Sequence, residues 1–549
     1  MTAVQEIRPA NPGFDVDLSV DVLIIGGGPS GVWAALSAIE DGATVAIAEK
    51  GYLGTSGPFG VGANTGIYYI MPDDQEQRDA IVHARQPIAF GLSDPAWGYK
   101  VFDQSYANLD LMARWGYEWP RNSQGKEYRG SLRGPTILHF LREILVAKGA
   151  TILDHSPALE LLVSDGVAAG ARGVNKQKGT TWQVRAGSVI VATGGTAFLS
   201  GVVGSKTHTG DGYLLAAEAG AHFSGMEFSS QYHAAPAESN LTRGAYREGM
   251  GTYTDNNGQP TQEGRKMVQS ITETGAVWDQ LDKTKDPKTQ DLMRKTHAAA
   301  FQYFERKGIN PFEERYPVTF LLEGTIRAAG GIAIDDDLQT TVPGLFASGD
   351  VTSREKLVGA GPPGGGPASA WAFATGAFAG HSAAAFAKRY GARIHDRKVE
   401  AVGGVGMRPS DRPRVTADEV IDVVRDEMLP FEKNYWRNAP TMATSLDRLN
   451  GLWKDARDGL APVQHNDAKL RARSAMRARE AAALLAAGRW IYASANERTE
   501  SRGLHRRSDF PELDPRQNGQ HVLTGGLDDL WVKRKAWSPT LTLAQEQAA

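Results

Sequence analysis

The stretch "DVLIIGGGPSGVWAALSAIEDGATVAIAEK", from Asp21 to Lys50, decides the fold of the N-terminal part of this chain. Its run Val22–Ile25 is apolar and rich in β-branched residues, as in a buried parallel strand. A helix is predicted over Val32–Glu40, and a second strand over Thr44–Ala48. This order of strand, glycine turn, helix and strand is typical of a nucleotide-binding α/β unit.

The glycines of the turn satisfy the pattern G-x-G-x-x-G at Gly26, Gly28 and Gly31. The first makes the tight turn, the second lets the backbone approach a pyrophosphate, and the third lets the helix pack close to the strand. The free N–H groups at the helix N-terminus then face the phosphates. Glu49 ends the second strand roughly 20 residues later, where an acid is expected to bind a ribose hydroxyl. The motif alone fits FAD and NAD equally.

Two later strands favour FAD. "VIVATGG" (Val189–Gly195) and "GLFASGDV" (Gly344–Val351) are buried-strand patterns that end in glycine, the second followed by an acid that FAD folds bring to the ribityl and phosphate region. An ordinary NAD domain would not need them. Only one complete G-x-G-x-x-G unit stands in a strand–helix context, which argues against a separate NAD(P)H domain. The residues expected to contact FAD are Gly26, Gly28, Gly31, Glu49, Lys50, Ser56, Gly57, Ala158, Thr193, Gly194, Asp211, Gly349, Asp350, Ala368 and Ser369.

Composition limits the partners. The chain has 549 residues, a net charge of −3 and no cysteine. This charge gives no electrostatic case for binding nucleic acid or an anionic membrane. Without cysteine, disulfides, thiolate zinc sites and the usual iron–sulfur ligation are excluded, so any iron–sulfur centre must belong to another protein. We expect no metal site, and the N-terminus shows no signal-peptide pattern, which predicts a cytoplasmic protein.

Changes of composition divide the chain into five parts. We expect a polar arm over 1–20, a first FAD-binding part over 21–224, a capping or substrate domain over 225–328, a second FAD-binding part over 329–410, and a helical C-terminal region over 411–549. The predicted fold class is therefore α/β, with a Rossmann-like FAD-binding domain that carries an inserted domain and a helical C-terminal region. Such an insertion builds a cleft, where ligands bind preferentially.

One small-residue stretch, Ser369–Ala387, is long enough to span a bilayer. It consists mostly of Ala, Gly and Ser and carries His381. We therefore predict a tightly packed interior helix and no membrane insertion.

Longer motifs give the chain a family resemblance. "HTGDGYLLAAEAGAHFSGMEFSSQYH" (His208–His233) and "SANERTESRGLHRRSDFPELD" (Ser494–Asp514) are the most specific. With "AGGIAID" and "GLFASGD", they resemble the flavoprotein subunits of succinate dehydrogenase and fumarate reductase, with L-aspartate oxidase and adenylylsulfate reductase as relatives. The resemblance covers most of the chain and implies an FAD-dependent oxidoreductase.

The sequence departs from this family at three places. Gly57 falls where covalent members carry the flavin-linking histidine, which implies non-covalent FAD. The histidine expected before "GGI" is replaced by Ile326 or Arg327, and the dicarboxylate-gripping arginine by the glycine-rich stretch Gly359–Ser369. Fumarate or succinate chemistry is therefore doubtful. "TSGPFG" and "RYPVTFLLEG" are more similar to the adenylylsulfate reductase branch, which implies a separate ferredoxin-like iron–sulfur partner.

The resemblance nominates catalytic residues. His233 would face the substrate above the flavin, or else make a structural hydrogen bond at a strand end. Arg247 could bind a carboxylate or sulfate, or form a surface ion pair with little effect. Arg327 could bind an anionic substrate or stabilise reduced flavin, or be an ordinary loop arginine. His208, His505 and Arg506 are expected to be structural, and Asp211 to orient loop groups near FAD.

Three functions remain open. The first is an oxidoreductase that acts on a small anionic or carbonyl-bearing substrate at flavin N5 and exchanges electrons with a ferredoxin-like partner. The second is a flavin oxidase of an amine or amino acid that uses oxygen. The third is a flavin electron-transfer subunit without its own substrate site. A homo-oligomer is compatible with each of them.

Overall fold

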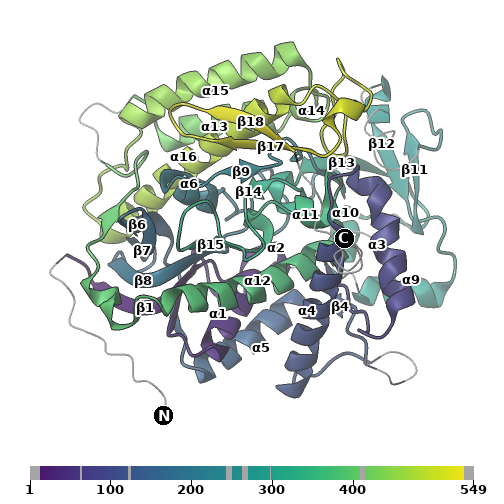
Figure 1. Cartoon of the computed structure of the whole chain (residues 1–549). Helices are drawn as coiled ribbons and strands as arrows, with labels where there is room; N and C mark the ends of the chain where they lie inside the picture. Colours follow the sequence, from purple (N-terminus) through teal and green to yellow (C-terminus); the bar gives the residue numbers. More distant parts are fainter. Residues whose placement is uncertain are drawn as a thin grey trace.

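The computed structural model describes residues 13–61, 65–121, 125, 127–242, 250–261, 270–271, 273–296, 298–408 and 414–536. A mixed sheet lies at its centre, covered by helices on both sides (Figure 1). The strands of this sheet are β1 (Val16–Ile25), β2 (Val45–Ala48), β5 (Thr151–Leu153), β6 (Ala158–Ser164), β7 (Val167–Val174), β8 (Thr181–Val191), β15 (Leu345–Ala347) and β16 (Glu400–Ala401).

The parallel part of the sheet carries the dinucleotide fold. β1 pairs in parallel with β2 and β8, β2 pairs with β5, and β15 pairs with the last residues of β8. The first residues of β8 pair instead with β7 of the β6–β7 hairpin, which turns at Asp165 and Gly166 as an Asp-Gly pair predicts. Segments more than 300 residues apart in sequence, β1 and β15, therefore flank the same strand.

Two helices cover one face of this sheet. α1 (Pro29–Glu40) begins directly after the glycine turn, and α12 (Gly365–Ala387) packs across it, as Figure 1 shows. Because Gly376 has no side chain, the backbone of Ser30 can lie directly against α12. Fifteen of the 23 residues of α12 are buried, which agrees with the predicted interior helix. Among the described helices, none is long and apolar enough to cross a membrane.

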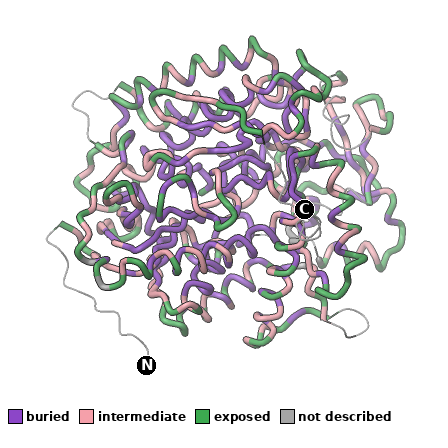
Figure 2. The backbone as a smooth tube through the Cα atoms, in the orientation of Figure 1, coloured by how far each residue is buried: buried purple, intermediate pink, exposed green. Residues whose placement is uncertain are grey.

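Further elements surround this layer. Between β2 and β5 lie α2 (Gly57–Val61), β3 (Thr65–Gly66), α3 (Gln75–Ala89), α4 (Pro95–Arg114), β4 (Ser131–Leu132) and α5 (Gly134–Ala147). α6 (Asp211–Glu218) follows β8. The short elements η1 (Gly324–Arg327), η2 (Gly349–Val351), α11 (Glu355–Val358) and η3 (Gly391–Asp396) form loops beside the central sheet. Figure 2 shows buried residues concentrated between these layers and exposed residues at the periphery.

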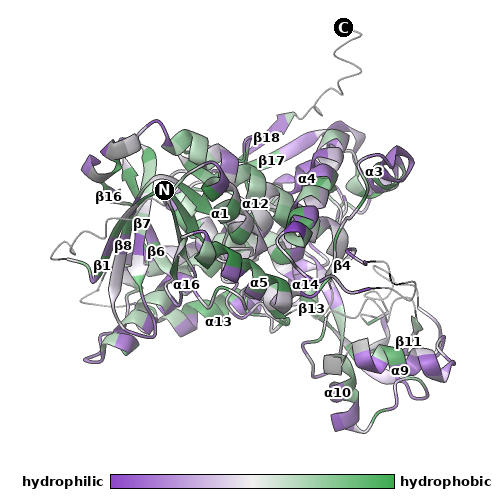
Figure 3. Cartoon of the chain, turned by 90° about the horizontal axis from the view of Figure 1, so that it is seen from below, coloured by the Kyte–Doolittle hydropathy of each residue, from purple (hydrophilic) through white to green (hydrophobic). Residues whose placement is uncertain are grey.

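The middle of the chain forms a separate antiparallel sheet. Its strands follow the order β10 (Tyr232–Pro236), β13 (Tyr316–Leu322), β12 (Val277–Gln280) and β11 (Thr252–Asp255), with helices α9 (Pro287–Thr296) and α10 (Ala298–Lys307) alongside. Seen from below, α9, α10 and β11 project away from the rest of the chain (Figure 3). Local patterns in the sequence do not indicate this sheet as a whole, because three of its strands have only four or five residues and pair with partners distant in sequence.

The C-terminal region is more than helical. Its helices are α13 (Ala417–Met428), α14 (Phe431–Asn434), α15 (Ala439–Gly459) and α16 (Ala468–Glu497). After a short turn, η4 (Pro515–Gln517), the hairpin β17 (Gln520–Gly525) and β18 (Trp531–Ala536) follows, and β17 pairs with β9 (Phe223–Ser224), next to β14 (Gly331–Ile332). The description of this region as only helical is therefore incomplete, since partner strands some 300 residues upstream decide the pairing.

Buried charges hold this region to the rest of the chain. Arg498 lies 2.8 Å from Glu227 and 2.9 Å from Glu500, and all three side chains are at most 1 % exposed. His505 is fully buried; its Nδ1 accepts from Arg437 at 3.0 Å, and its Nε2 lies 3.0 Å from the carbonyl oxygen of Arg498. Burial and the neighbouring Arg437 hold the pKa of His505 well below its usual value. The structural role expected of this histidine agrees with its position.

Candidate functional site

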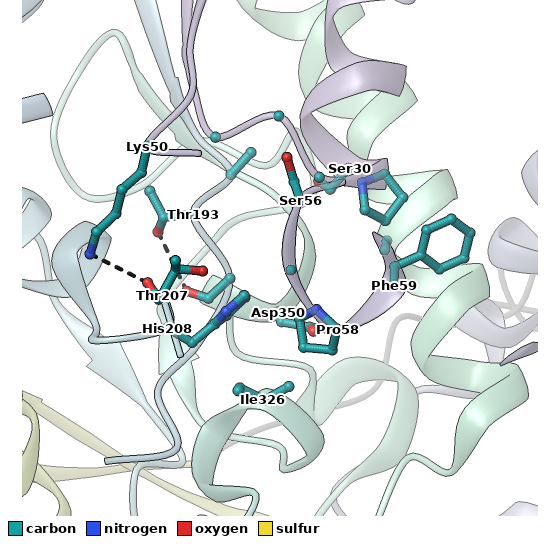
Figure 4. A pocket seen from close by; sticks show the side chains of 18 of the residues that line it. Ser30, Lys50, Ser56, Pro58, Phe59, Thr193, Thr207, His208, Ile326 and Asp350 are labelled. Carbon is teal, nitrogen blue, oxygen red and sulfur yellow. Dashed lines mark hydrogen bonds between the residues drawn. The ribbon is translucent and has the colours of Figure 1, made fainter. Parts of the chain in front are cut away.

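A cavity of about 1210 Å³, part of it open to solvent, lies at the carboxyl ends of the parallel strands. Ile25 ends β1, Ala48 ends β2, Ala192 follows β8, and Asp350 follows β15; all four line the cavity. In open α/β sheets this edge is where ligands bind. Figure 4 shows part of the cavity wall.

Most of the residues that the sequence assigned to FAD gather on this wall. They come from the first glycine turn, the end of β2, α2, the segment after β8, α6, η2 and the start of α12. The assigned residues that line the cavity are Gly26, Gly28, Glu49, Lys50, Ser56, Gly57, Ala158, Thr193, Gly194, Asp211, Asp350, Ala368 and Ser369.

Two other assigned glycines lie behind the wall. A side chain on Gly31 would collide with the backbone of Gly26, so this glycine brings the turn and the helix together. Gly349 has a φ of +74°, and a Cβ there would lie 2.8 Å from Cβ of Ser30, which itself lines the cavity. Both glycines shape the cavity through their neighbours and do not line it.

Glu49 is held by the backbone around it. Its two carboxylate oxygens accept hydrogen bonds from the N–H groups of Gly27 and Gly51, each at 2.6 Å, and the residue is 7 % exposed. An ionised carboxylate offers about four acceptor positions, so two remain for hydroxyl groups of a ligand. This arrangement fits the predicted ribose contact.

Lys50 joins the cavity to the C-terminal region. Its Nζ lies 2.7 Å from Asp211 Oδ2, 2.6 Å from Glu480 Oε1 and 2.9 Å from Thr209 Oγ1. Burial alone would lower the pKa of Lys50, but the two carboxylates outweigh it and hold that pKa well above its usual value. Lys50 therefore stays charged, and Glu480 ties α16 to the cavity wall.

The glycine-rich stretch before α12 divides into two parts. Side chains on Gly359 and Gly361 would collide with the backbone of residues 88–89 at the end of α3, so these glycines serve packing. Gly365, Ala368 and Ser369 line the cavity at the N-terminus of α12. Only the second part therefore lies at the cavity, and the helix end there favours negative charge.

A buried carboxylate connects two of the predicted catalytic residues. Glu323 is 1 % exposed, and its Oε2 lies 2.9 Å from Nε of Arg327 and 3.4 Å from Nδ1 of His233. Its Oε1 accepts from Thr242 Oγ1 at 2.9 Å. Arg327 lines the cavity, whereas His233 lies on β10 outside its lining. The third predicted residue, Arg247, is outside the described residues.

Arg354 fixes the loop that carries Arg327. This fully buried guanidinium donates to the carbonyl oxygens of Thr325, Ile326 and Ala328 at 2.8–3.1 Å, and to Asp350 at 2.6 Å. Asp350 and Ile326 both line the cavity. Arg354 therefore holds both Asp350, the acid after the late FAD strand, and the loop that carries Arg327.

Sequence reasoning missed Glu323, Glu480 and Arg354. Glu323 stands four residues before Arg327, and Arg354 four after Asp350, a spacing that suggests local pairs but not burial. Glu480 lies in a long helix 430 residues from Lys50, and no local signal could have found it. Among the described residues, no group of three or more His, Cys, Asp or Glu is placed to hold a metal ion.

The fold and this cavity define a dinucleotide-binding protein of the FAD class. The glycine turn, Glu49 and Asp350, which the sequence assigned to FAD, line the same cavity. Comparison with known families agrees: residues 21–368 match the FAD binding domain family, and residues 432–547 match the fumarate reductase flavoprotein C-terminal family. The chain belongs to the FAD-binding flavoprotein family of succinate dehydrogenase and fumarate reductase, and is an FAD-dependent oxidoreductase.

Similar proteins extend over nearly the whole chain. The fumarate reductase flavoprotein subunit of Haemophilus influenzae is 25 % identical, over 92 % of this chain and 92 % of that protein. L-aspartate oxidase of Mycobacterium leprae is 25 % identical, over 94 % of this chain and 98 % of that protein. The E. coli quinol fumarate reductase structure superposes with a TM-score of 0.79 at 21 % identity, covering 96 % of this chain and 98 % of that one. Adenylylsulfate reductase of Archaeoglobus fulgidus gives 0.74 at 17 % identity, with 96 % of each chain covered.

Proposed function

We propose that this chain binds FAD without a covalent bond and acts on a small anionic or carbonyl-bearing substrate, exchanging electrons with a separate ferredoxin-like protein. Bound FAD supplies two-electron redox chemistry. The observation that carries the proposal is the ion pair of Glu323 with Arg327, because it places a held guanidinium in the wall of the cavity. Such a guanidinium offers a fixed fork to a carboxylate or a sulfate.

The chain's own residues would bind and orient the substrate. Glu323 Oε2 lies 2.9 Å from Nε of Arg327 and 3.4 Å from Nδ1 of His233, so this one carboxylate would hold both side chains in place. Arg354 holds the carbonyl oxygens of the same loop and thereby limits its movement. Arg247 is proposed as an additional anion ligand on the family resemblance alone.

The electron partner is proposed from composition. The chain has no cysteine to hold an iron–sulfur cluster. The similar protein of Haemophilus influenzae is named as the flavoprotein subunit of a fumarate reductase, which supports a multi-protein arrangement here.

A second candidate is an oxidase of an amine or amino acid. It is favoured by the similarity to proteins named L-aspartate oxidase, at 25 % identity over 94 % of this chain for the Mycobacterium leprae enzyme. The electron-transfer reading without a substrate site is a third candidate, and the ion pair at the cavity wall weighs against it.

Anaerobic reduction of the bound flavin by a panel of hydroxy acids, amino acids, sulfite and reduced ferredoxin tests these proposals. The first function predicts reduction by ferredoxin or a non-amine substrate and slow reoxidation in air. Fast reoxidation with peroxide after reduction by an amino acid would favour the oxidase. Arg327→Ala should abolish reduction by the substrate but not by dithionite, and an unchanged substrate response would show that Arg327 does not bind the substrate.

A further inference from the structure

The cavity wall contains a histidine that no step above uses. His208 lies in the segment between β8 and α6 and is 8 % exposed, and its side chain lines the cavity. Its backbone N–H donates to the carbonyl oxygen of Ser205 at 2.9 Å. The same segment packs on α2, since a Cβ on Gly204 would lie 2.6 Å from Cα of Pro58. Figure 4 shows the ring directed toward the part of α2 that carries Pro58.

The His208 ring occupies a slot made by two glycines. A Cβ on Gly57 would lie 2.9 Å from Cε1 of the ring and 3.3 Å from Nε2. A Cβ on Gly194 would lie 2.6 Å from Nε2 and 2.7 Å from Cδ2. Real methyl carbons do not approach ring atoms so closely, so the ring fits only because both positions lack a side chain. Gly57 is the first residue of α2, and Gly194 lies in the segment that follows β8.

The position of Gly57 relates this slot to the flavin. In the covalent members that the sequence resembles, the residue at this position links to the flavin, and here its side-chain space is filled by an imidazole from another segment. We propose that His208 is an FAD-contacting residue that takes the place of the side chain missing at Gly57 and retains the flavin without a bond. This inference rests on the proposed non-covalent binding of FAD at the same cavity.

The shape and polarity of an imidazole suit this role. The ring combines a flat carbon surface with one hydrogen-bond donor and one acceptor, so it can pack on the cofactor and still satisfy a polar atom. Replacement by alanine would leave a water-accessible gap between Gly57 and Gly194, and the cofactor would lose one wall.

The test compares His208→Ala with a matched control, His381→Ala. His381 lies on α12 outside the cavity lining, with its side chain 45 % exposed and its Nδ1 2.9 Å from Asp41. FAD is removed from each purified full-length protein and titrated back while flavin fluorescence is followed. We expect the Kd for FAD to rise about tenfold for H208A, which corresponds to about 1.4 kcal/mol, and to stay within about twofold for H381A. An unchanged Kd and flavin absorption spectrum in H208A would overturn the proposal.

A double-mutant cycle keeps the test valid if H208A folds poorly. Gly57→Ala forces a methyl group against the ring in the wild type but not in H208A, while the backbone strain of alanine at a φ of +63° is the same in both. We therefore expect G57A to weaken FAD binding about fivefold more in the wild type than in H208A. Equal effects in the two backgrounds would show that ring and position 57 do not share this space. A wild type that binds no FAD, or keeps it after acid precipitation, contradicts the proposed non-covalent FAD and not the role of His208 alone.

Discussion

Gly376→Ala should weaken FAD binding although Gly376 does not line the cavity. A Cβ there would lie 3.0 Å from Cβ of Trp33 and 3.1 Å from the carbonyl carbon of Ser30, with the oxygen of Ser30 nearer still. Ser30 lies in the first turn of α1 and lines the cavity. Because the neighbouring atoms are backbone, α1 as a whole must move away from α12.

The expected cost follows from two opposed effects. Alanine in a helix interior is favoured over glycine by about 1 kcal/mol. Overpacking in a filled interface costs about 1–3 kcal/mol, and contact with backbone places this site at the upper end. We therefore expect G376A to lower the free energy of unfolding by about 1–2 kcal/mol. Because the N-terminus of α1 would bind the pyrophosphate, its shift should raise the Kd for FAD about tenfold.

The control is Gly451→Ala on α15, where a Cβ meets nothing within 4 Å. This change should leave FAD binding unaltered and stabilise the protein by up to about 1 kcal/mol. Urea unfolding measures the stability and fluorescence titration measures the Kd. If G376A behaves as G451A does, the close packing of α1 on α12 does not position the cavity.

Three further changes test the buried charges. Glu480→Gln removes one of the two carboxylates that contact Lys50. It should lower the free energy of unfolding in urea by about 1–3 kcal/mol and weaken FAD binding. An unchanged urea midpoint would contradict a stabilising contact between α16 and the cavity wall. His505→Gln should remove part of the acid sensitivity: since the folded state keeps His505 neutral, only the unfolded chain binds its proton below its usual pKa, and stability is lost as pH falls. Between about pH 7.5 and pH 5.5 this group should cost the wild type about 1.4 kcal/mol that the variant does not lose, and parallel pH profiles would refute the assignment. Glu323→Gln should weaken substrate binding about tenfold, as seen in flavin reduction titrations, and leave the Kd for FAD within about twofold; equal losses of both would show that Glu323 supports the whole cavity.

The sequence could predict those parts of the fold that local patterns encode. The glycine turn, α1 and β2 lie where the stretch from Asp21 to Lys50 places them, because the turn geometry and the strand pattern are both local. β1 instead begins at Val16, inside the arm predicted over 1–20, because Val16–Val20 pair with β8. The late FAD strand and the interior helix α12 were found in the same way. The antiparallel sheet of the middle region and the pairing of β17 with β9 were not, since short strands are stabilised by partners distant in sequence.

What the sequence determined by itself is the chemistry of the cofactor site: glycines where a phosphate must approach backbone, the acids Glu49 and Asp350 after two of the strands, and no cysteine for a cluster. What only the tertiary structure decided is which residues from distant segments contact one another. Lys50 and Glu480, or Gly57 and the ring of His208, come from segments more than 150 residues apart, and their contact depends on how helices and loops pack around the sheet. Periodicity and motif spacing report the conformation of a segment, whereas a side-chain contact between segments depends on packing, which no single segment encodes.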